Sequence, residues 1–231
     1  MMSRLFTPDM ADYYERFYAS KGIHFEKNNV VTAFEAGADG RVAAAVLRSG
    51  ARVPCGLVVA GTGARPRTAL FEGQLKTADR PLGGILVDAT LASSHPDVFA
   101  AGDVAAFPLQ REGGRLVRQE HVVHARQSAA HAMRGMMGAP GTYDYLPYFY
   151  SRVFSLSWVF YGRQAGEVAT FGDLGQAGKW GAFWVEGGKC VGAFLESGSP
   201  EENAAVKKVA ETCPAAPEGL REAGLGWALS L

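Results

Sequence analysis

The first fifty positions of the chain predict one helix followed by a pair of strands. A hydroxyl, a proline and an acid follow one another at Thr7-Pro8-Asp9, which is the order typical of a helix start, so a helix is expected over 9–20. Apolar residues then recur in the strand-like segments 30–35 and 41–48. The Asp-Gly pair between these segments, in Gly37-Ala38-Asp39-Gly40, suits the turn of a hairpin.

Short apolar runs that end in a glycine or a carboxylate come next. Leu57-Val58-Val59-Ala60 predicts a short buried strand, and the segments 85–88 and 98–101 predict two more. The last of these runs directly into Gly102-Asp103. Because ligands bind beyond the carboxyl ends of strands in open α/β sheets, Asp103 is a candidate binding residue. A surface turn with an N-capping aspartate is an equally good interpretation of these six residues.

A long helix is predicted from about Glu120 to Met137, and Gly138-Ala139-Pro140-Gly141 ends it. Beyond this break the pattern becomes β-rich, with a hairpin expected over 180–195. Ser199, followed by a proline and by a glutamate three positions on, then predicts the start of another helix.

Composition excludes several classes of protein. The 231 residues carry a formal net charge of zero, which gives no general attraction to nucleic acid or to an anionic membrane. The cysteines, Cys55, Cys190 and Cys213, show no CxxC spacing, so we expect no disulfide framework, no zinc ribbon, no CxxC redox centre and a reducing compartment. No apolar run is long enough for a membrane span, and the start has no apolar core of a secretory signal.

The helix over 120–137 has two faces of different chemistry. The four positions that share the first face are Val122, Arg126, Ala129 and Met133, and those of the second are His121, His124, Ser128 and His131. We expect the histidine face to be solvated or hydrogen-bonded rather than to hold a metal, because no carboxylate or cysteine cluster accompanies it. The start of this helix is a potential anion site, since its free N–H groups and its dipole both favour negative charge.

Aromatic residues are concentrated in 144–162, beside the single cation Arg152. If 148–153 is extended, Tyr148, Tyr150 and Arg152 point to one face of the strand. A ring for stacking and a guanidinium for a planar anion would then be neighbours. A core strand with an arginine that reaches out to solvent is the alternative interpretation.

Six stretches carry a resemblance to a known family. They are VVAGTGARP, HPDVFAAGDVAAFP, EHVVHARQSA, YDYLPYFYSR, LSWVFYG and GAFLESGSPEEN, and they occur in the order found in that family. The chain resembles the flavin-dependent pyridine nucleotide oxidoreductases, and among them the monodehydroascorbate reductases. The resemblance covers nearly all of the chain, and EHVVHARQSA followed by YDYLPYFYSR is its most specific part.

The resemblance implies a fold and a division into domains. The expected fold class is α/β: a partial, three-layered Rossmann-like FAD- and NAD(P)-binding region, followed by an α+β C-terminal domain. The implied divisions are 1–75 for the end of the NAD(P)-binding domain, 76–140 for the end of the FAD-binding domain, and 141–231 for the C-terminal domain.

The resemblance also implies a reaction and the residues that bind the cofactors. NADH or NADPH would deliver a hydride to FAD, and the flavin would pass single electrons to two monodehydroascorbate radicals. By matching motifs, Asp103 would contact the ribityl–phosphate part of FAD and Val122 would lie at the flavin ring. Glu120 and His121 would lie near the nicotinamide cofactor. The glycines implied there are Gly61 and Gly63, which alone are a weak signal because AGTGARP is not a GxGxxG motif.

Three residues would act on the substrate. Tyr150 would stack in the region between flavin and nicotinamide, while Arg126 and Arg152 would hold the anionic ascorbate radical. The implied partner is therefore a small molecule, with no nucleic acid and no membrane. The compartment would be the cytoplasm or an organelle (plastid, mitochondrion or peroxisome), and the protein would not be secreted.

Two departures from the family pattern qualify this interpretation. The strand–GxGxxG–helix units that bind FAD and the nicotinamide dinucleotide occur nowhere in the chain, so we expect it to be the C-terminal half of a longer enzyme. It would then need a missing N-terminal half or self-association. The alternatives are a catalytically inert fragment and a related flavin-dependent, ferredoxin-type reductase, against which EHVVHAR and FYSR argue. Val123 also stands where the family pattern has an acidic residue.

Overall fold

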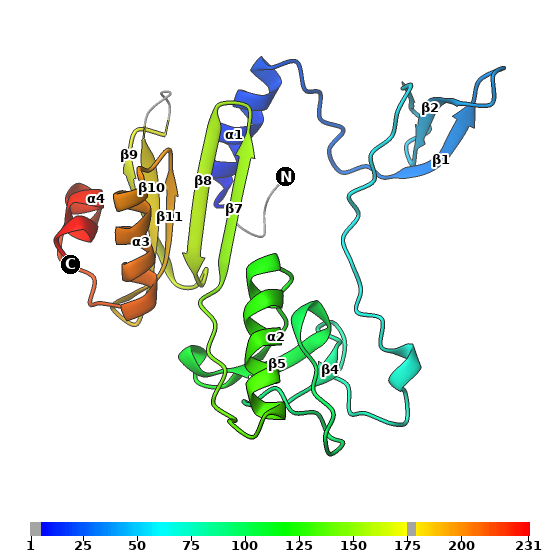
Figure 1. The fold of residues 1–231 in the computed structure, drawn as a ribbon. Coiled ribbons are helices and arrows are strands. Elements are labelled where there is room, and N and C mark those ends of the chain that lie inside the picture. The colour runs from blue at the N-terminus through cyan, green and yellow to red at the C-terminus, as the bar shows by residue number, and fades with distance from the viewer. Residues whose placement is uncertain (1–5, 175–178) are drawn as a thin grey trace. The chain divides into compact units, whose positions relative to one another are not determined.

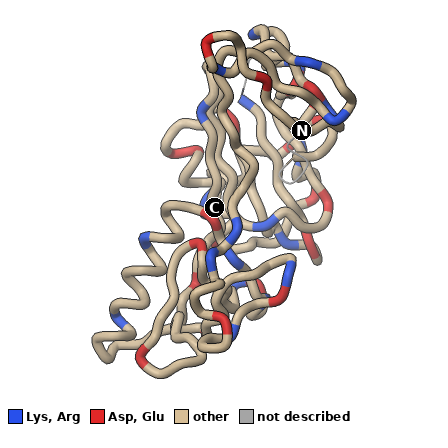
Figure 2. The backbone as a smooth tube through the Cα atoms, turned by 90° about the vertical axis from the view of Figure 1, so that its right-hand side faces the viewer, with Lys and Arg blue, Asp and Glu red and all other residues tan. Residues whose placement is uncertain are grey.

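The computed structural model describes residues 6–174 and 179–231 (Figure 1). The chain forms two compact units, one up to Ala64 and one from Arg65 onward. Lysines and arginines are interspersed with acids along the described backbone, and their numbers over the whole sequence are equal (Figure 2). None of the helices in these two ranges has the length and apolar character needed to cross a membrane.

The first unit contains the helix and the hairpin that its sequence predicts. Helix α1 (Pro8–Ser20) begins at the expected cap, where Met10 N donates to Thr7 Oγ1 over 3.4 Å. The strands β1 (Val31–Ala36) and β2 (Val42–Leu47) pair antiparallel, and β3 (Arg52–Pro54) extends the sheet in the order β1-β2-β3. These elements form because their capping and turn signals are local and do not depend on distant partners.

The strand expected over 57–60 is wrong. This segment has no regular secondary structure, and Leu57 and Val59 are 79% and 87% exposed. Apolar character predicted a buried strand, but a strand also needs a neighbour for its N–H and C=O groups. The described part of the chain supplies no such neighbour, and therefore the segment remains extended and solvated.

The second unit begins with a small sheet and a long helix. The strands β4 (Ile85–Leu86) and β5 (Ala105–Leu109) pair parallel, and β6 (Arg115–Val117) pairs antiparallel with β5. Helix α2 (Val122–Met136) follows, within two residues of the expected bounds. Short 3-10 turns form at Ala69–Phe71, Gly102–Val104 and Gln110–Glu112. The buried side chains around this sheet include Leu91, Phe107, Leu109, Tyr143 and Tyr145.

The strand expected over 98–101 is also wrong as a strand. Phe99 forms only an isolated bridge to Ala92, beside which Val98 O accepts from Ser93 N over 2.8 Å and Ala100 N donates to Leu91 O over 3.2 Å. The turn that follows, Gly102–Val104, is a 3-10 turn, so Asp103 still lies directly after an extended apolar segment. Unlike 57–60, this segment has a pairing partner, but one bridge is too short for a regular strand.

The rest of the second unit is an antiparallel sheet that two helices cover. Its five strands lie in the order β7-β8-β11-β10-β9, and α3 and α4 pack against one face of it (Figure 1). The hairpin around Gly187-Gly188 and the capped helix after Ser199 are confirmed. The bounds are β7 (Tyr148–Val153), β8 (Leu156–Gly162), β9 (Glu167–Gly172), β10 (Trp180–Glu186), β11 (Lys189–Glu196), α3 (Pro200–Thr212) and α4 (Leu220–Ser230).

Candidate functional site

His121 joins the start of α2 to the strand β7. Its backbone is extended (φ −151°), and its Nδ1 accepts a hydrogen bond from Val123 N over 3.1 Å, so it caps the helix. The other side of the ring meets β7 edge-on, with ring centroids 5.3 Å from Tyr148 and 5.9 Å from Tyr150. The motifs EHVVHAR and YFYSR, which are well separated in the sequence, are therefore in direct contact.

The exposed face of β7 is the one that alternation predicted. Tyr148 and Tyr150 stack with their ring centroids 5.6 Å apart, which places both rings on one face. Tyr148 also stacks on Tyr161 of β8 at 4.7 Å, whereas Tyr150 is half exposed. Arg152 is exposed two positions further along the strand, and therefore on the same face. This face offers an accessible ring beside a cation.

Asp103 is exposed on a turn that its neighbours hold rigidly. Gly102 has a positive φ of 72°, and its N–H donates to Ser128 Oγ of α2 over 2.9 Å. Arg118 Nη1 donates to the Asp103 carbonyl over 3.0 Å and pairs with Glu120 Oε1 at 2.6 Å. One guanidinium therefore links the Asp103 turn to the residue before the helix cap.

Electrostatics link Asp103 with His121. Burial lowers the pKa of His121 because desolvation disfavours the imidazolium, and the charge of Asp103 partly opposes this shift. The lowered pKa favours the neutral ring, which agrees with the cap, because Nδ1 must be unprotonated to accept the hydrogen bond from Val123 N–H.

The histidine face of α2 is hydrogen-bonded, as one of the two expected states. His124 and Ser128 are fully buried and hydrogen-bonded, whereas His121 and His131 are partly exposed. The opposite face, which we call the outer face of α2, is exposed, with Val122 50% and Met133 56% accessible. The residues of the outer face are Val122, Arg126, Ala129, Met133 and Met136. Arg126 is thus exposed one turn after the helix start.

Most of the residues proposed from the sequence lie in the second unit, around the contact of α2 with β7. His121 touches Tyr150, Glu120 pairs with Arg118, and Val122 is the first residue of the helix. Gly61 and Gly63 belong to the first unit, in its exposed extended segment, so their role stays a prediction. Sequence reasoning missed Arg118, for which no local signal exists, and it did not anticipate that Ser128 accepts from Gly102.

The cluster fits one end of a flavin cofactor. The Asp103 carboxylate can accept hydrogen bonds from hydroxyl groups, and the half-exposed Val122 and Tyr150 offer apolar surface for a ring. The start of α2 adds a positive dipole end. The chain has no GxGxxG loop for a pyrophosphate, so these residues fit the ribityl and ring parts and not the whole dinucleotide.

The fold matches solved reductases. The ferredoxin reductase for the CYP199A2 system of Rhodopseudomonas palustris has a TM-score of 0.85 and 27% identity to this chain. The match covers 99% of this chain and 56% of that one. The expected fold class, a Rossmann-like α/β region followed by an α+β domain, is confirmed, and it is the fold of this solved reductase.

Comparison with family models identifies the family of the chain. The model for pyridine nucleotide-disulphide oxidoreductases matches residues 1–132, and the model for the monodehydroascorbate reductase 3-like C-terminal domain matches residues 146–228. The chain belongs to the pyridine nucleotide-disulphide oxidoreductase family, which is a family of enzymes. The resemblance seen in the sequence is therefore confirmed.

Curated relatives agree with this placement. Peroxisomal monodehydroascorbate reductase 1 of Oryza sativa subsp. japonica is 50% identical over 215 residues, which is 89% of this chain and 44% of that protein. Monodehydroascorbate reductase of Pisum sativum is 45% identical over 237 residues, which is 98% of this chain and 54% of that protein. The chain thus spans about half the length of the curated relatives it matches.

Proposed function

We propose that this protein acts as a monodehydroascorbate reductase, using NADH or NADPH to return the monodehydroascorbate radical to ascorbate. The observation that carries this proposal is the contact of His121, at the start of α2, with the exposed aromatic face of β7. The identity to relatives with this name supports the substrate. The chemistry that a bound FAD supplies is uptake of a hydride and its release as single electrons.

The cofactor-binding residues would act through hydrogen bonds and packing. Asp103 would accept hydrogen bonds from the ribityl hydroxyls, because its carboxylate is exposed on a turn that Ser128 and Arg118 fix. Val122 would pack on the flavin ring. The dipole of α2 would favour negative charge on that ring, since the charge would lie at the N-terminus of a helix.

The nicotinamide would lie on the side of Glu120 and His121. His121 contributes a neutral ring that is already oriented by its cap to Val123 N and by its contacts with β7. In the first unit, the backbone at Gly61 and Gly63 would admit a dinucleotide closely, because neither residue has a Cβ and no described atom lies within 4 Å of the Cβ positions.

The substrate radical is a planar anion, and the chain presents two cations for it. Arg126 and Arg152 are exposed, and neither makes an ion pair with another of the described residues. Unpaired guanidinium groups attract anions over a distance and can bind them in bidentate fashion, through two parallel hydrogen bonds. The half-exposed Tyr150 would supply the stacking surface.

A ferredoxin-type reductase is the second candidate, because the ferredoxin reductase of Rhodopseudomonas palustris has the same fold. A chain without activity of its own is the third candidate, because the GxGxxG motifs are absent from the sequence. For the compartment we propose an organelle or the cytoplasm, since one relative is named peroxisomal and the pea enzyme carries no such term.

The test combines a spectrum with an assay. The 231-residue protein is incubated with FAD, desalted, and examined for flavin absorption. NADH and NADPH oxidation are then followed with three acceptors in turn: the radical generated from ascorbate by ascorbate oxidase, ferricyanide, and a bacterial ferredoxin.

We expect retained flavin and oxidation of the nicotinamide that depends on the radical. Retained flavin with reduction of ferredoxin but not of the radical would favour the second candidate. A colourless protein that reduces none of the acceptors would identify this chain as inert by itself, and the proposed activity would then be abandoned for it.

A further inference from the structure

A buried polar cluster lies directly behind the Asp103 turn. His124 and Ser128, one helical turn apart on the inner face of α2, are both 0% exposed, and Tyr143 is 4% exposed. Polar groups are expensive to bury unless they are hydrogen-bonded. The contacts that these three side chains make therefore indicate what the cluster is for.

Ser128 holds the backbone of the turn. Its Oγ accepts from Gly102 N over 2.9 Å and donates to Ala125 O over 3.2 Å, so both functions of the hydroxyl are used. Gly102 has φ +72°, a conformation that is favourable for glycine and that positions the following carboxylate. The hydroxyl thus fixes the one residue whose backbone sets the direction of Asp103.

His124 belongs to the same buried cluster. Its Nδ1 lies 3.1 Å from Tyr143 Oη, and its ring stacks on Phe107 with centroids 5.2 Å apart. Burial lowers the pKa of His124, because desolvation disfavours the imidazolium. The ring therefore fills the space between α2, Phe107 and Tyr143.

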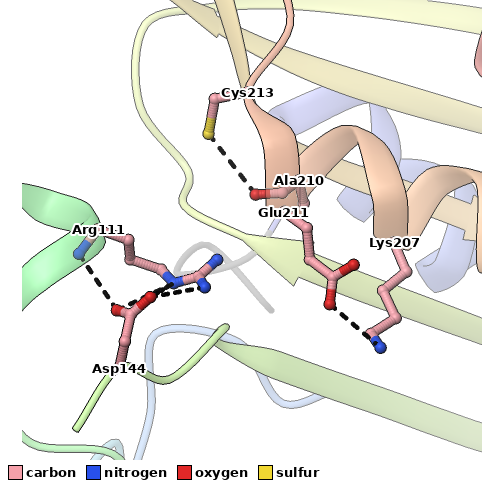
Figure 3. Close-up of polar contacts among 6 residues, drawn as sticks. All are labelled: Arg111, Asp144, Lys207, Ala210, Glu211 and Cys213. Carbon is pink, nitrogen blue, oxygen red and sulfur yellow. Dashed lines mark hydrogen bonds and ion pairs between the residues drawn. The ribbon is translucent and has the colours of Figure 1, made fainter. Parts of the chain in front are cut away.

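The partner of His124 is itself anchored. Tyr143 N donates to Ala89 O over 2.7 Å, and the next residue, Asp144, accepts from Arg111 Nη2 at 2.8 Å and from Arg111 N at 3.2 Å (Figure 3). His131 Nε2 lies 2.7 Å from Gly141 O. The segment that carries Tyr143 is thus fixed on both sides, and it can act as a rigid support for the imidazole.

We propose that Ser128 is a positioning residue, which holds the Gly102–Asp103 turn so that the Asp103 carboxylate meets the ribityl hydroxyls of FAD. This inference rests on the proposed function, because the ligand is that of the proposed enzyme. Its side chain would not touch the cofactor. Ser128 acts through the backbone of Gly102, from the buried side of the turn.

A double-mutant cycle separates positioning from simple support of the core. The full chain is prepared unmodified and as Ser128→Ala, Asp103→Ala and the combination, and the Kd for FAD is measured by flavin fluorescence. We expect Ser128→Ala to raise the Kd for FAD by about 2- to 12-fold, which corresponds to the free energy of one hydrogen bond. In the Asp103→Ala background, the same substitution should leave the Kd for FAD unchanged. Equal effects in both backgrounds would overturn the inference.

A second measurement does not depend on the cofactor. Amide hydrogen exchange of the FAD-free chain reports on the Gly102 N–H, and we expect exchange about 2- to 12-fold faster in Ser128→Ala. His131→Gln is the matched control, because His131 is on the same helix and contacts Gly141 but not Gly102. Unchanged exchange at Gly102 in Ser128→Ala would exclude the positioning role.

A further variant covers the case in which Ser128→Ala does not fold. Ser128→Cys keeps the size of the side chain but replaces the hydroxyl by a weakly hydrogen-bonding thiol, so we expect the same direction of change in Kd and in exchange at Gly102. If the unmodified chain binds no FAD, the proposed function fails, and the exchange at Gly102 still decides whether Ser128 holds the turn.

Discussion

At the scale of residues, the site combines fixed side chains with free ones. His121 is held by the helix that it caps and by the rings that it touches, and Arg118 is held by two carbonyls and Glu120. Arg152 is exposed and without an ion pair among the described residues. A cofactor needs the first kind of group, because orientation matters most there, whereas a diffusing anion is captured by the second.

Removing Arg152 should weaken the reaction with the radical more than the reaction with the nicotinamide. We expect Arg152→Ala to lower kcat/KM for the radical by about 10- to 100-fold, which corresponds to the free energy of a hydrogen bond to a charged group. The rate of NADH-dependent ferricyanide reduction should stay the same. Steady-state kinetics with both acceptors measure this. Arg134→Ala, an exposed cation at the far end of α2, is the control. Equal loss with both acceptors would mean that Arg152 is structural.

Burial of His124 should make the second unit less stable in acid. Desolvation lowers its pKa from the ordinary value of 6.5, so below about pH 6.5 the unfolded chain binds a proton that the folded chain does not. The free energy of unfolding should therefore fall with pH there, by at most about 1.4 kcal/mol per unit from this residue. Urea unfolding at several pH values, followed by tryptophan fluorescence, measures the slope.

The fluorescence reports on the second unit because Trp158, Trp180, Trp184 and Trp227 all lie in it. His124→Gln should show a shallower dependence between pH 7 and pH 5. Part of the slope should remain, because burial also lowers the pKa of His121. Identical slopes in the two proteins would show that His124 is protonated in the folded state.

At the scale of elements, β7 is the edge strand of its sheet, and this position makes its face available. Among the described residues only β8 pairs with it, and its outer residues Tyr150 and Arg152 are exposed. An edge strand is open to pairing with other chains unless a charge or a twist prevents it. A charge such as that of Arg152 on this edge would oppose such pairing.

The opposite edge of the sheet depends on a glycine. Gly166, just before β9, has φ +80°, and a Cβ there would lie 1.9 Å from Val185 O. Gly166→Ala combines backbone strain with a clash against a rigid backbone, so we expect a loss of stability on the order of 3 kcal/mol. Gly226→Ala is the control, because nothing lies within 4 Å of its Cβ position. Thermal unfolding of both variants compares them, and equal midpoints would contradict the clash.

At the scale of the whole molecule, the chain consists of two compact units with an exposed segment at their junction. From 56 to 67 the backbone makes no hydrogen bond to another of the described residues. Such segments open to proteases without any unfolding of the units beside them.

Limited trypsin digestion should therefore cut first in this segment. Arg65 precedes a proline and resists trypsin, whereas Arg67 is exposed and is followed by threonine. We expect early fragments of residues 1–67 and 68–231, identified by mass spectrometry. A first cut within α2 or the five-stranded sheet would show that the second unit is less stable than its packing indicates.

What the sequence could predict depended on how local the signals were. The helices after Thr7 and Ser199 were predictable because their caps lie within three residues of the groups they bond. The extended runs at 57–60 and 98–101 were misjudged as strands because pairing partners are not a local property. In the site, alternation along β7 placed Tyr148 and Tyr150 on one face, as the structure confirms.

The long-range contacts that hold the site could not be predicted from the sequence. Ser128 is 26 positions from Gly102, and Arg118 is 36 positions from Leu82, whose carbonyl it binds. No spacing rule links residues so far apart. The burial of His124 was missed for the same reason, because the rings of Phe107 and Tyr143 that cover it come from a strand and a loop outside the helix.

The outer face of α2 has a chemical consequence of its own. Met133 and Met136 are 56% and 54% exposed, and the cap Met137 is 78% exposed, whereas Met10 is fully buried. Peroxide converts an accessible thioether to a sulfoxide, which is polar, and water is released. Peptide mapping after mild peroxide treatment should find sulfoxides on this helix and leave Met10 intact. Oxidative damage would thus begin on the helix that carries the proposed flavin contact.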